Sequence, residues 1–217
     1  MKVDMHVHTV YSQDSKIELL ELLRYARKLG IGVGITDHNR IKGALHGVKL
    51  GKTLGVFVVP GIEVSTKAGH VIGYNLDVEV KQGLSVEETI EKIRDAGGFV
   101  VIPHPYRFVS GIGDLVKRVY CDAIEVQNSR NSAGVNRKAR EIAEQGKKGF
   151  SAGSDAHSIE EVGTSYVVAD AEKVENLLEQ ISKGDVEVYG NSRGVGSVIA
   201  QYGKMLSGYI KRGFRRV

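Results

Sequence analysis

Short apolar runs alternate with amphipathic stretches along most of the 217-residue chain, and this order limits the folds that it can adopt. Runs typical of buried strands lie at 3–7, 31–35, 56–59, 99–102, 123–126, 149–152, 166–169 and 186–189. Strands that alternate with helices indicate βαβ units and a mainly parallel sheet. Because roughly seven such units follow one another, we expect an α/β fold with a closed (β/α) barrel rather than an open sheet.

Local sequence signals predict where two helices and a hairpin begin. Ser15-Lys16-Ile17-Glu18 and Ser85-Val86-Glu87-Glu88 both have the spacing of a capping box. They predict a helix over 17–29, stopped by Gly30, and a second helix that runs to Ala96. The runs 62–65 and 70–74 are separated by a short turn and are expected to pair as a hairpin.

Six of the seven histidines lie in short motifs that hold carboxylates or prolines, or that follow a glycine. These motifs are Asp4-Met5-His6-Val7-His8-Thr9, Thr36-Asp37-His38-Asn39, Gly69-His70, Pro103-His104-Pro105 and Gly153-Ser154-Asp155-Ala156-His157. Neutral imidazole and carboxylate are the usual donors to borderline and hard metal ions. We expect each motif at or just past the carboxyl end of a strand, the rim where (β/α) barrels build active sites. The pattern predicts one polynuclear metal site.

Spacing within the motifs points to chelation. His6 and His8 are two residues apart on a predicted strand, so both side chains face the same side. Asp155 and His157 repeat that spacing, and Gly153 lets another backbone approach closely. The prolines on both sides of His104 restrict its backbone and hold its imidazole in place.

Four further residues have two interpretations each. Asp14 supplies an oxygen ligand, or Asp14 or Ser15 caps the first helix. Asp37 precedes the ligand His38 and is interpreted as a carboxylate that hydrogen-bonds a metal-bound imidazole and orients it. Glu63 bridges two ions or is a solvated surface residue. His70 is a ligand or a buried, hydrogen-bonded histidine.

The number of donors indicates more than one ion. A catalytic zinc takes about three protein ligands. The chain offers eight donors, or nine with His70: His6, His8, Asp14, His38, Glu63, His104, Asp155 and His157. They suit two or three divalent ions, and nitrogen and oxygen donors accept manganese, zinc or iron alike. Paired ions favour in-line displacement at phosphorus, because they activate water and neutralise the attacked and leaving oxygens.

The order His-x-His, Asp-His, Glu, His-Pro, Asp-x-His, from about Asp4 to His157, resembles the polymerase and histidinol phosphatase (PHP) domain of metal-dependent phosphoesterases. The resemblance implies a distorted seven-stranded (β/α)7 TIM-like barrel and a trinuclear site. It carries the ligand role to the eight donors above, and His70 matches a ligand of some members. Full ligand sets often include a histidine or cysteine where this chain has Asn128 or Ser129. This departure leaves the third metal position open, and Asn128 could orient water or substrate there.

The function expected from these motifs is hydrolysis of a phosphomonoester or a short nucleotide phosphodiester. Arg107 and Arg130 follow His104 and Asn128 closely, and are either bidentate phosphate ligands on the rim or ordinary surface residues. Rival activities are a histidinol-phosphate-type phosphatase and a 5′–3′ exonuclease. A different class, an RNA-binding PHP-like subunit without catalysis, is the remaining alternative.

Composition separates a barrel over 1–189 from a basic segment over 190–217. That segment has six basic residues and no acidic one, which leaves −2 of the chain's net +4 for the barrel. The apolar residues of this segment have helical spacing, so we expect a helix that packs on the barrel. A second interpretation is that its basic residues bind nucleic acid, and a third is that it forms a helix on a membrane surface. No apolar run approaches the roughly 20 residues of a membrane span. The single Cys121 and the absence of a signal peptide lead us to expect a cytoplasmic protein.

Overall fold

A single sheet organises the protein, and the computed structural model describes it over residues 1–194. The described part has nine strands, whose spatial order is β7-β6-β5-β4-β3-β2-β1-β8-β9. Their bounds are β1 Lys2–Val7, β2 Gly32–Ile35, β3 Val58–Thr66, β4 Gly69–Tyr74, β5 Phe99–Ile102, β6 Ala123–Asn128, β7 Gly149–Gly153, β8 Ser165–Val168 and β9 Glu187–Gly190. The predicted terminal helix falls at 195 and beyond, outside the described residues.

The sheet nearly closes on itself into a barrel. Beyond β7, the Asp155 amide donates to the His6 carbonyl (2.8 Å) and the His8 amide donates to the Ala156 carbonyl (3.0 Å), so the chain after β7 lies against β1. The expected α/β fold is confirmed, but the expected count of seven strands is not. The sheet has nine, because β8 and β9 extend it in antiparallel fashion from β1.

The expected hairpin forms and interrupts the parallel pattern. Strand β3 pairs antiparallel with β4 through a register that includes Glu63 opposite Ile72 and Ser65 opposite His70. Strand β4 then pairs antiparallel with β5, whereas β1–β2, β2–β3, β5–β6 and β6–β7 are parallel. Because β4 runs against its neighbours, its first residues lie at the edge where the parallel strands end.

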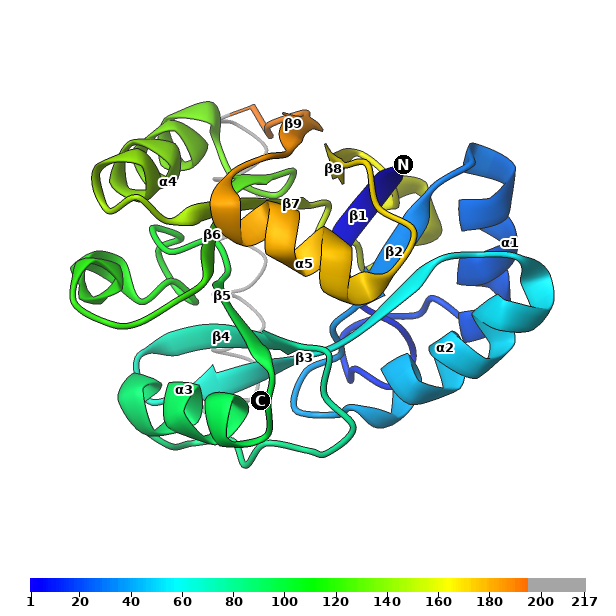
Figure 1. Ribbon diagram of the computed structural model, residues 1–217, viewed down its shortest axis with the longest axis horizontal. Helices are drawn as coiled ribbons and strands as arrows, with labels where there is room; N and C mark the ends of the chain where they lie inside the picture. The colour runs from blue at the N-terminus through cyan, green and yellow to red at the C-terminus, as the bar shows by residue number, and fades with distance from the viewer. Residues whose placement is uncertain (195–217) are drawn as a thin grey trace, which may run out of the picture.

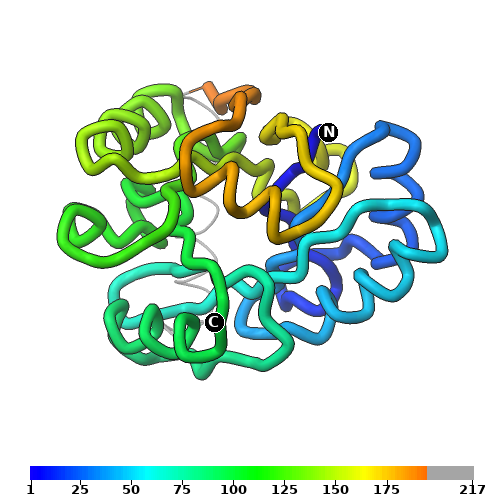
Figure 2. The backbone as a smooth tube through the Cα atoms, in the orientation of Figure 1, coloured from blue at the N-terminus to red at the C-terminus, as the bar shows by residue number. Residues whose placement is uncertain are grey.

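Five α-helices of the described region cover the sheet: α1 Leu19–Leu29, α2 Lys42–Leu54, α3 Val86–Asp95, α4 Ala133–Gln145 and α5 Val174–Lys183. Two short 3₁₀ helices, η1 Gly113–Lys117 and η2 Ile159–Glu161, lie in loops. Figure 1 shows α1 to α4 around the outside of the sheet, while α5 crosses the middle of the view; the tube in Figure 2 follows the same path. Within residues 1–194 no helix combines the length and apolarity needed to cross a bilayer.

The two predicted capping boxes have different outcomes. At α3 the Ser85 side chain accepts from the Glu88 amide (3.1 Å) and the Glu88 carboxylate accepts from the Ser85 amide (2.8 Å), so that box is confirmed. The box at Ser15 is wrong, because α1 begins at Leu19 and its N-cap residue Glu18 makes no side-chain capping bond. The Ser15 hydroxyl instead donates to the His8 carbonyl (2.9 Å).

An apolar layer closes one end of the barrel. Glu63 is paired with Ile72, and Ile72 with Val101, so these three side chains share one face of the sheet. Ile72 and Val101 belong to a buried cluster that also contains Leu177 and Ile181 of α5. Helix α5 therefore seals the apolar end of the barrel, and the polar side chains gather at the opposite end.

Candidate metal centre

One buried carboxylate lies at the centre of the polar end. The Glu63 side chain is 1% exposed and projects from β3, so the interpretation of Glu63 as a solvated surface residue is wrong. Its two oxygens lie within 3.3 Å of five imidazoles: His6 Nε2 (3.3 Å), His8 Nε2 (3.3 Å), His38 Nδ1 (3.2 Å), His70 Nδ1 (2.8 Å) and His104 Nε2 (3.1 Å). Histidines from four of the five motifs thus meet at Glu63.

The two histidines of β1 face the same side, as their spacing predicts. Their Nε2 atoms are 3.1 Å apart, and both rings are fully buried. Asp155 Oδ1 lies 3.9 Å from His6 Nε2 and 3.5 Å from His8 Nε2. The pair therefore lies between two carboxylates, one from β3 and one from the loop after β7.

The loop after β7 adds the second part of the cluster. His157 Nε2 lies 2.9 Å from Asp14 Oδ2, and the same Asp14 oxygen lies 3.6 Å from His38 Nε2. Asp14 therefore faces the histidines and does not cap α1. A Cβ added to Gly153 would lie 2.3 Å from the His6 Cβ, so the close approach predicted for this glycine is real.

The backbone is strained at two cluster residues. His104 has φ 29° and Asp155 has φ 57°, in a region that non-glycine residues rarely occupy. His104 stands between Pro103 and Pro105, and its amide is held by Glu125 Oε2 (2.8 Å). Such strain persists only where the surroundings fix it, and it is common at functional sites.

One expectation about position needs correction. His70 opens β4 and Glu63 lies within β3, so neither follows the carboxyl end of a strand. Since β4 is antiparallel to β3, the start of β4 still lies at the polar end of the barrel. His70 is partly exposed and contacts Glu63, which places its imidazole in the cluster.

Arginines and one asparagine form the border of the cluster. Arg107 donates through Nη1 to Asp155 Oδ2 (2.6 Å) and through Nη2 to Asn128 Oδ1 (2.7 Å). Arg130 Nη1 lies 2.5 Å from His157 Nδ1 and 3.8 Å from Asp155 Oδ1. Both guanidinium groups are largely buried beside cluster residues, unlike ordinary surface arginines.

Asp37 supports the site in a different way from the one expected. It accepts hydrogen bonds from the Thr9 amide (2.6 Å) and hydroxyl, and from the Ser12 hydroxyl (3.2 Å), rather than from an imidazole. Ser12 in turn contacts His8 Nδ1 (3.2 Å) and accepts from the His38 amide (2.8 Å). Asp37 therefore fixes the loop after β1, and its effect on the histidines passes through Ser12.

Sequence reasoning missed Glu125 and the role of Asp4. Glu125 is buried in β6, with Oε1 3.0 Å from His6 Nδ1 and Oε2 accepting from Asn128 Nδ2 (2.9 Å). Asp4, fully buried, accepts from the amides of Ser154 and Gly163 (2.8 Å each). In both strands a carboxylate alternates with apolar residues, and that alternation was the signal that could have revealed an inward-facing acid.

Burial and neighbouring charges oppose each other in the pKa values of the acids. Burial raises the pKa of Glu63, but the charges of His70, His38 and His6 outweigh it and hold this pKa well below the usual range. The pKa of Asp155 is also held well below normal, because Arg107 and His6 overcome the effect of burial. Both carboxylates are thus anions in the folded protein.

The imidazoles divide into two groups. Burial lowers the pKa of His6 and of His38, yet the surrounding carboxylates raise the first well above its usual value and the second to about 9. Burial, together with the charge of His38, lowers the pKa of His8. Burial and then Arg107 lower the pKa of His104 to about 4. Without a bound cation, the anionic centre holds protons on His6 and His38.

The donor set fits divalent metal ions. Four overlapping groups of three residues place one ligand atom each within 4.8 Å of the others: His8, His38 and His157; His6, His104 and Glu125; His6, His8 and Glu63; His38, Glu63 and His70. The buried Nδ1 of His104 has no hydrogen-bond partner among the described residues, which is costly for a polar atom. Nitrogen and oxygen donors in this number suit more than one ion.

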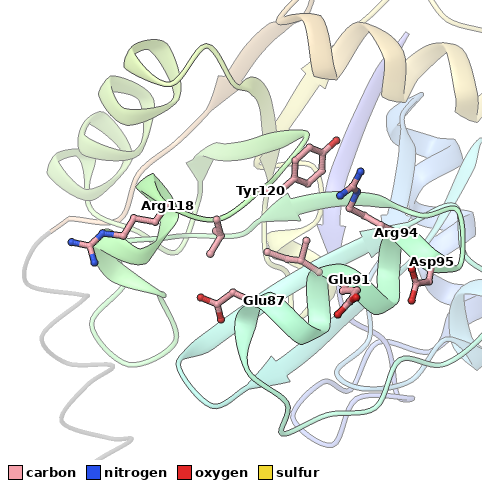
Figure 3. A pocket seen from close by; sticks show the side chains of 8 residues that line it. Glu87, Glu91, Arg94, Asp95, Arg118 and Tyr120 are labelled. Atoms are coloured by element: carbon pink, nitrogen blue, oxygen red, sulfur yellow. The ribbon is translucent and has the colours of Figure 1, made fainter.

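The hollow in Figure 3 is a separate feature. It has a volume of about 630 Å³ and lies between α3 and the segment after η1. Arg94 lies over the Tyr120 ring there, 4.2 Å from its centroid. None of its lining residues belongs to the histidine cluster: Glu87, Ile90, Glu91, Arg94, Asp95, Arg118, Val119 and Tyr120.

Known proteins are similar to this chain in sequence. The family model described as PHP-associated matches residues 134–186. The uncharacterized protein MJ1587 of Methanocaldococcus jannaschii is 42% identical over 147 residues, which cover 62% of this chain and 86% of that protein. A second protein of that organism, the uncharacterized MJ0417, is 35% identical over 176 residues, 77% of this chain and 70% of its own length.

Two solved structures have a similar fold. A two-domain protein of Bacteroides vulgatus, described as containing a predicted PHP-like metal-dependent phosphoesterase, superposes with a TM-score of 0.72 at 16% identity. The match covers 88% of this chain but only 65% of that longer one. An amidohydrolase of Chromobacterium violaceum with bound sulfate has a TM-score of 0.66 at 18% identity and covers 85% and 97%.

Fold and cluster together define a barrel protein with a histidine- and carboxylate-rich centre at one end. With these relatives and neighbours, the chain belongs to the PHP (polymerase and histidinol phosphatase) domain family.

Proposed function

We propose that this chain is a metal-dependent phosphoesterase. The observation that carries the proposal is the Glu63 carboxylate, which has five imidazole nitrogens within 3.3 Å of its oxygens. Carboxylate oxygens and imidazole nitrogens that have lost their protons are the donors that divalent cations take. The neighbour described as containing a predicted PHP-like metal-dependent phosphoesterase supports the same proposal.

Two or three ions of manganese, zinc or iron are proposed as the cofactors. Their ligands would come from His6, His8, Asp14, His38, Glu63, His70, His104, Asp155 and His157. Bound divalent ions supply an activated water and neutralise charge on the phosphoryl group. A nucleophilic side chain is then unnecessary.

The surrounding residues have distinct proposed roles. Arg107 and Arg130 bind the phosphate, for which paired N–H donors in a rigid fork are well suited. Asn128 holds one arm of the Arg107 guanidinium (2.7 Å) and so sets its direction. Asp37 keeps the loop that carries His8 in place, through Thr9 and Ser12.

The proposed substrate is a phosphomonoester or a short nucleotide phosphodiester. To test this, chelator-treated protein would be reloaded with manganese, zinc or iron and assayed on phosphomonoesters, dinucleotides and oligonucleotides. We expect turnover that depends on the metal, is lost in Glu63→Gln and is kept in Glu141→Gln, whose carboxylate is exposed on α4. Histidinol-phosphate-type phosphatase and 5′–3′ exonuclease activities would differ in which substrates are cleaved. RNA binding without hydrolysis under any metal would contradict the proposal.

A further inference from the structure

A short segment after β9 joins two parts of the chain that border the candidate centre. We call this segment, residues 191–193, the clasp. In Figure 1 the chain runs from β9 towards α4 at this point. The Asn191 amide donates to the Thr164 carbonyl (3.0 Å), and the Ser192 hydroxyl accepts from Asn136 Nδ2 (3.1 Å). The clasp is therefore attached to the loop after η2 on one side and to α4 on the other.

The third residue of the clasp, Arg193, makes the same connection with its backbone and its side chain. The Arg193 amide donates to the carbonyl of Asn131, between β6 and α4 (2.8 Å). Its guanidinium donates through Nη2 to Glu161 Oε1 of η2 (2.6 Å). The two side chains of this pair are only 27% and 28% exposed. A short, charge-assisted bond that is partly shielded from water fixes its partners better than an exposed ion pair does.

Glu161 passes this contact on to a candidate metal ligand, because its Oε2 accepts from the His157 amide (2.9 Å). The two residues before His157, Asp155 and Ala156, form backbone hydrogen bonds with the chain of β1 and its continuation. Asp155 has φ 57°, a conformation that persists only where the surroundings hold it. Strand β1 thus fixes the first two residues of the Asp-x-His motif, and Glu161 fixes the third.

The other contact of the clasp supports an arginine that we propose to bind phosphate. Asn131 Oδ1 accepts from Arg107 Nε (3.0 Å), while the carbonyl of the same Asn131 accepts from the Arg193 amide. One residue therefore lies between Arg193 and Arg107, and one between Arg193 and His157. The clasp connects the support of the phosphate-binding border to the support of the metal-binding loop.

We propose that Arg193 is a positioning residue of the candidate centre. Through Glu161 it holds the backbone of His157, and through Asn131 it fixes the support of Arg107. Residues that orient a metal ligand from outside the metal's own contacts contribute to affinity for the metal. The inference rests on the proposed function, since it assigns Arg193 a part in metal binding, but it also makes a prediction for the metal-free protein.

The first test follows the His157 amide without metal. Amide hydrogen exchange in chelator, measured by NMR, reports how often this amide separates from Glu161. We expect Arg193→Ala to speed the exchange about 10-fold, because the Glu161 carboxylate loses the charged donor that holds it. Arg193→Lys keeps a cation next to Glu161 and should recover most of the protection. An unchanged exchange rate in Arg193→Ala would overturn the inference.

Lys183→Ala is the matched control. It also removes an ion pair with a nitrogen–oxygen distance of 2.6 Å, from Lys183 Nζ to Glu179 Oε1, but this pair lies exposed on α5 at the apolar end of the barrel. Exchange at His157 and affinity for metal should both keep their wild-type values in this variant. A change as large as that in Arg193→Ala would show that the effect is not specific to the clasp, and would contradict the inference.

The second test measures metal binding through a double-mutant cycle. Co²⁺ accepts the same nitrogen and oxygen donors as zinc, and its visible absorption reports both affinity and the number of ions bound. We expect Arg193→Ala and Glu161→Gln each to weaken Co²⁺ binding about 10-fold without changing the number of ions. The double variant should lose no more than either single variant, because both changes remove the same contact. Losses that multiply to about 100-fold would mean that the two residues act separately, against the inference.

The two tests separate this inference from the proposed function. Wild-type protein that binds no Co²⁺ would contradict the proposed function, while hydrogen exchange would still decide whether Arg193 holds the His157 loop. Wild-type protein that binds Co²⁺ with the same affinity as Arg193→Ala would leave the proposed function standing and would overturn the role of Arg193.

Discussion

At the scale of single residues, the candidate centre depends on buried acids whose charge is compensated by imidazoles. Glu63 is the contact shared by five histidines, whereas Glu125 contacts His6 Nδ1, the His104 amide and Asn128 Nδ2. The two carboxylates therefore differ in role: Glu63 is placed to coordinate, and Glu125 to orient a ligand ring.

Replacement of Glu125 by Gln tests that difference. The neutral amide no longer attracts the proton on His6 Nδ1, so the ring loses part of its orientation and basicity. We expect metal affinity to fall by about 10- to 100-fold while the metal stoichiometry stays unchanged. Competition with a chromogenic chelator measures both, with Glu141→Gln as the surface control. A lower stoichiometry would show that Glu125 is itself a ligand.

Proton release on metal binding follows from the raised pKa values of His6 and His38. A metal-bound imidazole nitrogen carries no proton, so protons held by the metal-free site must leave. Affinity should therefore rise with pH from neutral to at least about 9, the pKa of His38. Calorimetry in two buffers with different ionisation enthalpies measures the release directly. Identical apparent enthalpies in both buffers would contradict this expectation.

Some site residues could be predicted from the sequence and others could not. The His-x-His spacing at the end of β1 shows that His6 and His8 share a face, whereas Asp155 and His157 lie in the loop after β7, where strand alternation does not apply. Glu125 was missed because nothing in the sequence next to a single acid in an apolar strand indicates which residue that acid contacts. Its partner His6 lies 119 residues away, and only the barrel brings them together.

At the scale of elements, identical local signals had different outcomes. The boxes at Ser15 and Ser85 have the same spacing, but only Ser85 caps a helix. Ser15 is drawn to the His8 carbonyl, and Asp14 to His157, so contacts across the cluster override the local preference. The positions of the strands and the hairpin were predicted well, because strands that are buried in the core consist of runs of apolar residues that can be recognised in the sequence.

The cap on α3 makes a specific stability prediction. Ser85→Ala removes the acceptor for the Glu88 amide and should lower the free energy of unfolding by about 1 kcal/mol. Ser132→Ala is the matched control, because Ser132 stands at the N-cap of α4 without a side-chain capping bond. Urea unfolding followed by circular dichroism compares the two. Equal losses in both variants would mean that the capping box does not stabilise α3.

At the scale of the whole molecule, the barrel separates a sealed apolar end from a polar end. The sequence predicts the α/β order, but the nine-strand sheet and its near closure depend on contacts such as Asp155 to His6 that join distant segments. A strand count from apolar runs cannot tell a strand of the barrel wall from one that extends the sheet outward.

Cys121 reports on the integrity of this packing. It is 3% exposed, and burial raises the pKa of its thiol to about 11. We expect no labelling by a thiol reagent at pH 8 in native protein and rapid labelling in urea. The thiol of the unfolded chain loses its proton near pH 8.5. The free energy of unfolding should therefore fall as pH rises from about 9 to 11, and the Cys121→Ala variant should not show this part of the decrease. Rapid labelling of the native protein would contradict the buried position.

The convergence of distant imidazoles and carboxylates around bound cations is tested most directly by diffraction at the zinc absorption edge from crystals grown with zinc. The account predicts at least two anomalous peaks, each about 2.0–2.2 Å from nitrogen or oxygen atoms of the cluster, with Glu63 contacting one or both. An ordered cluster without an anomalous peak at Glu63 would contradict it.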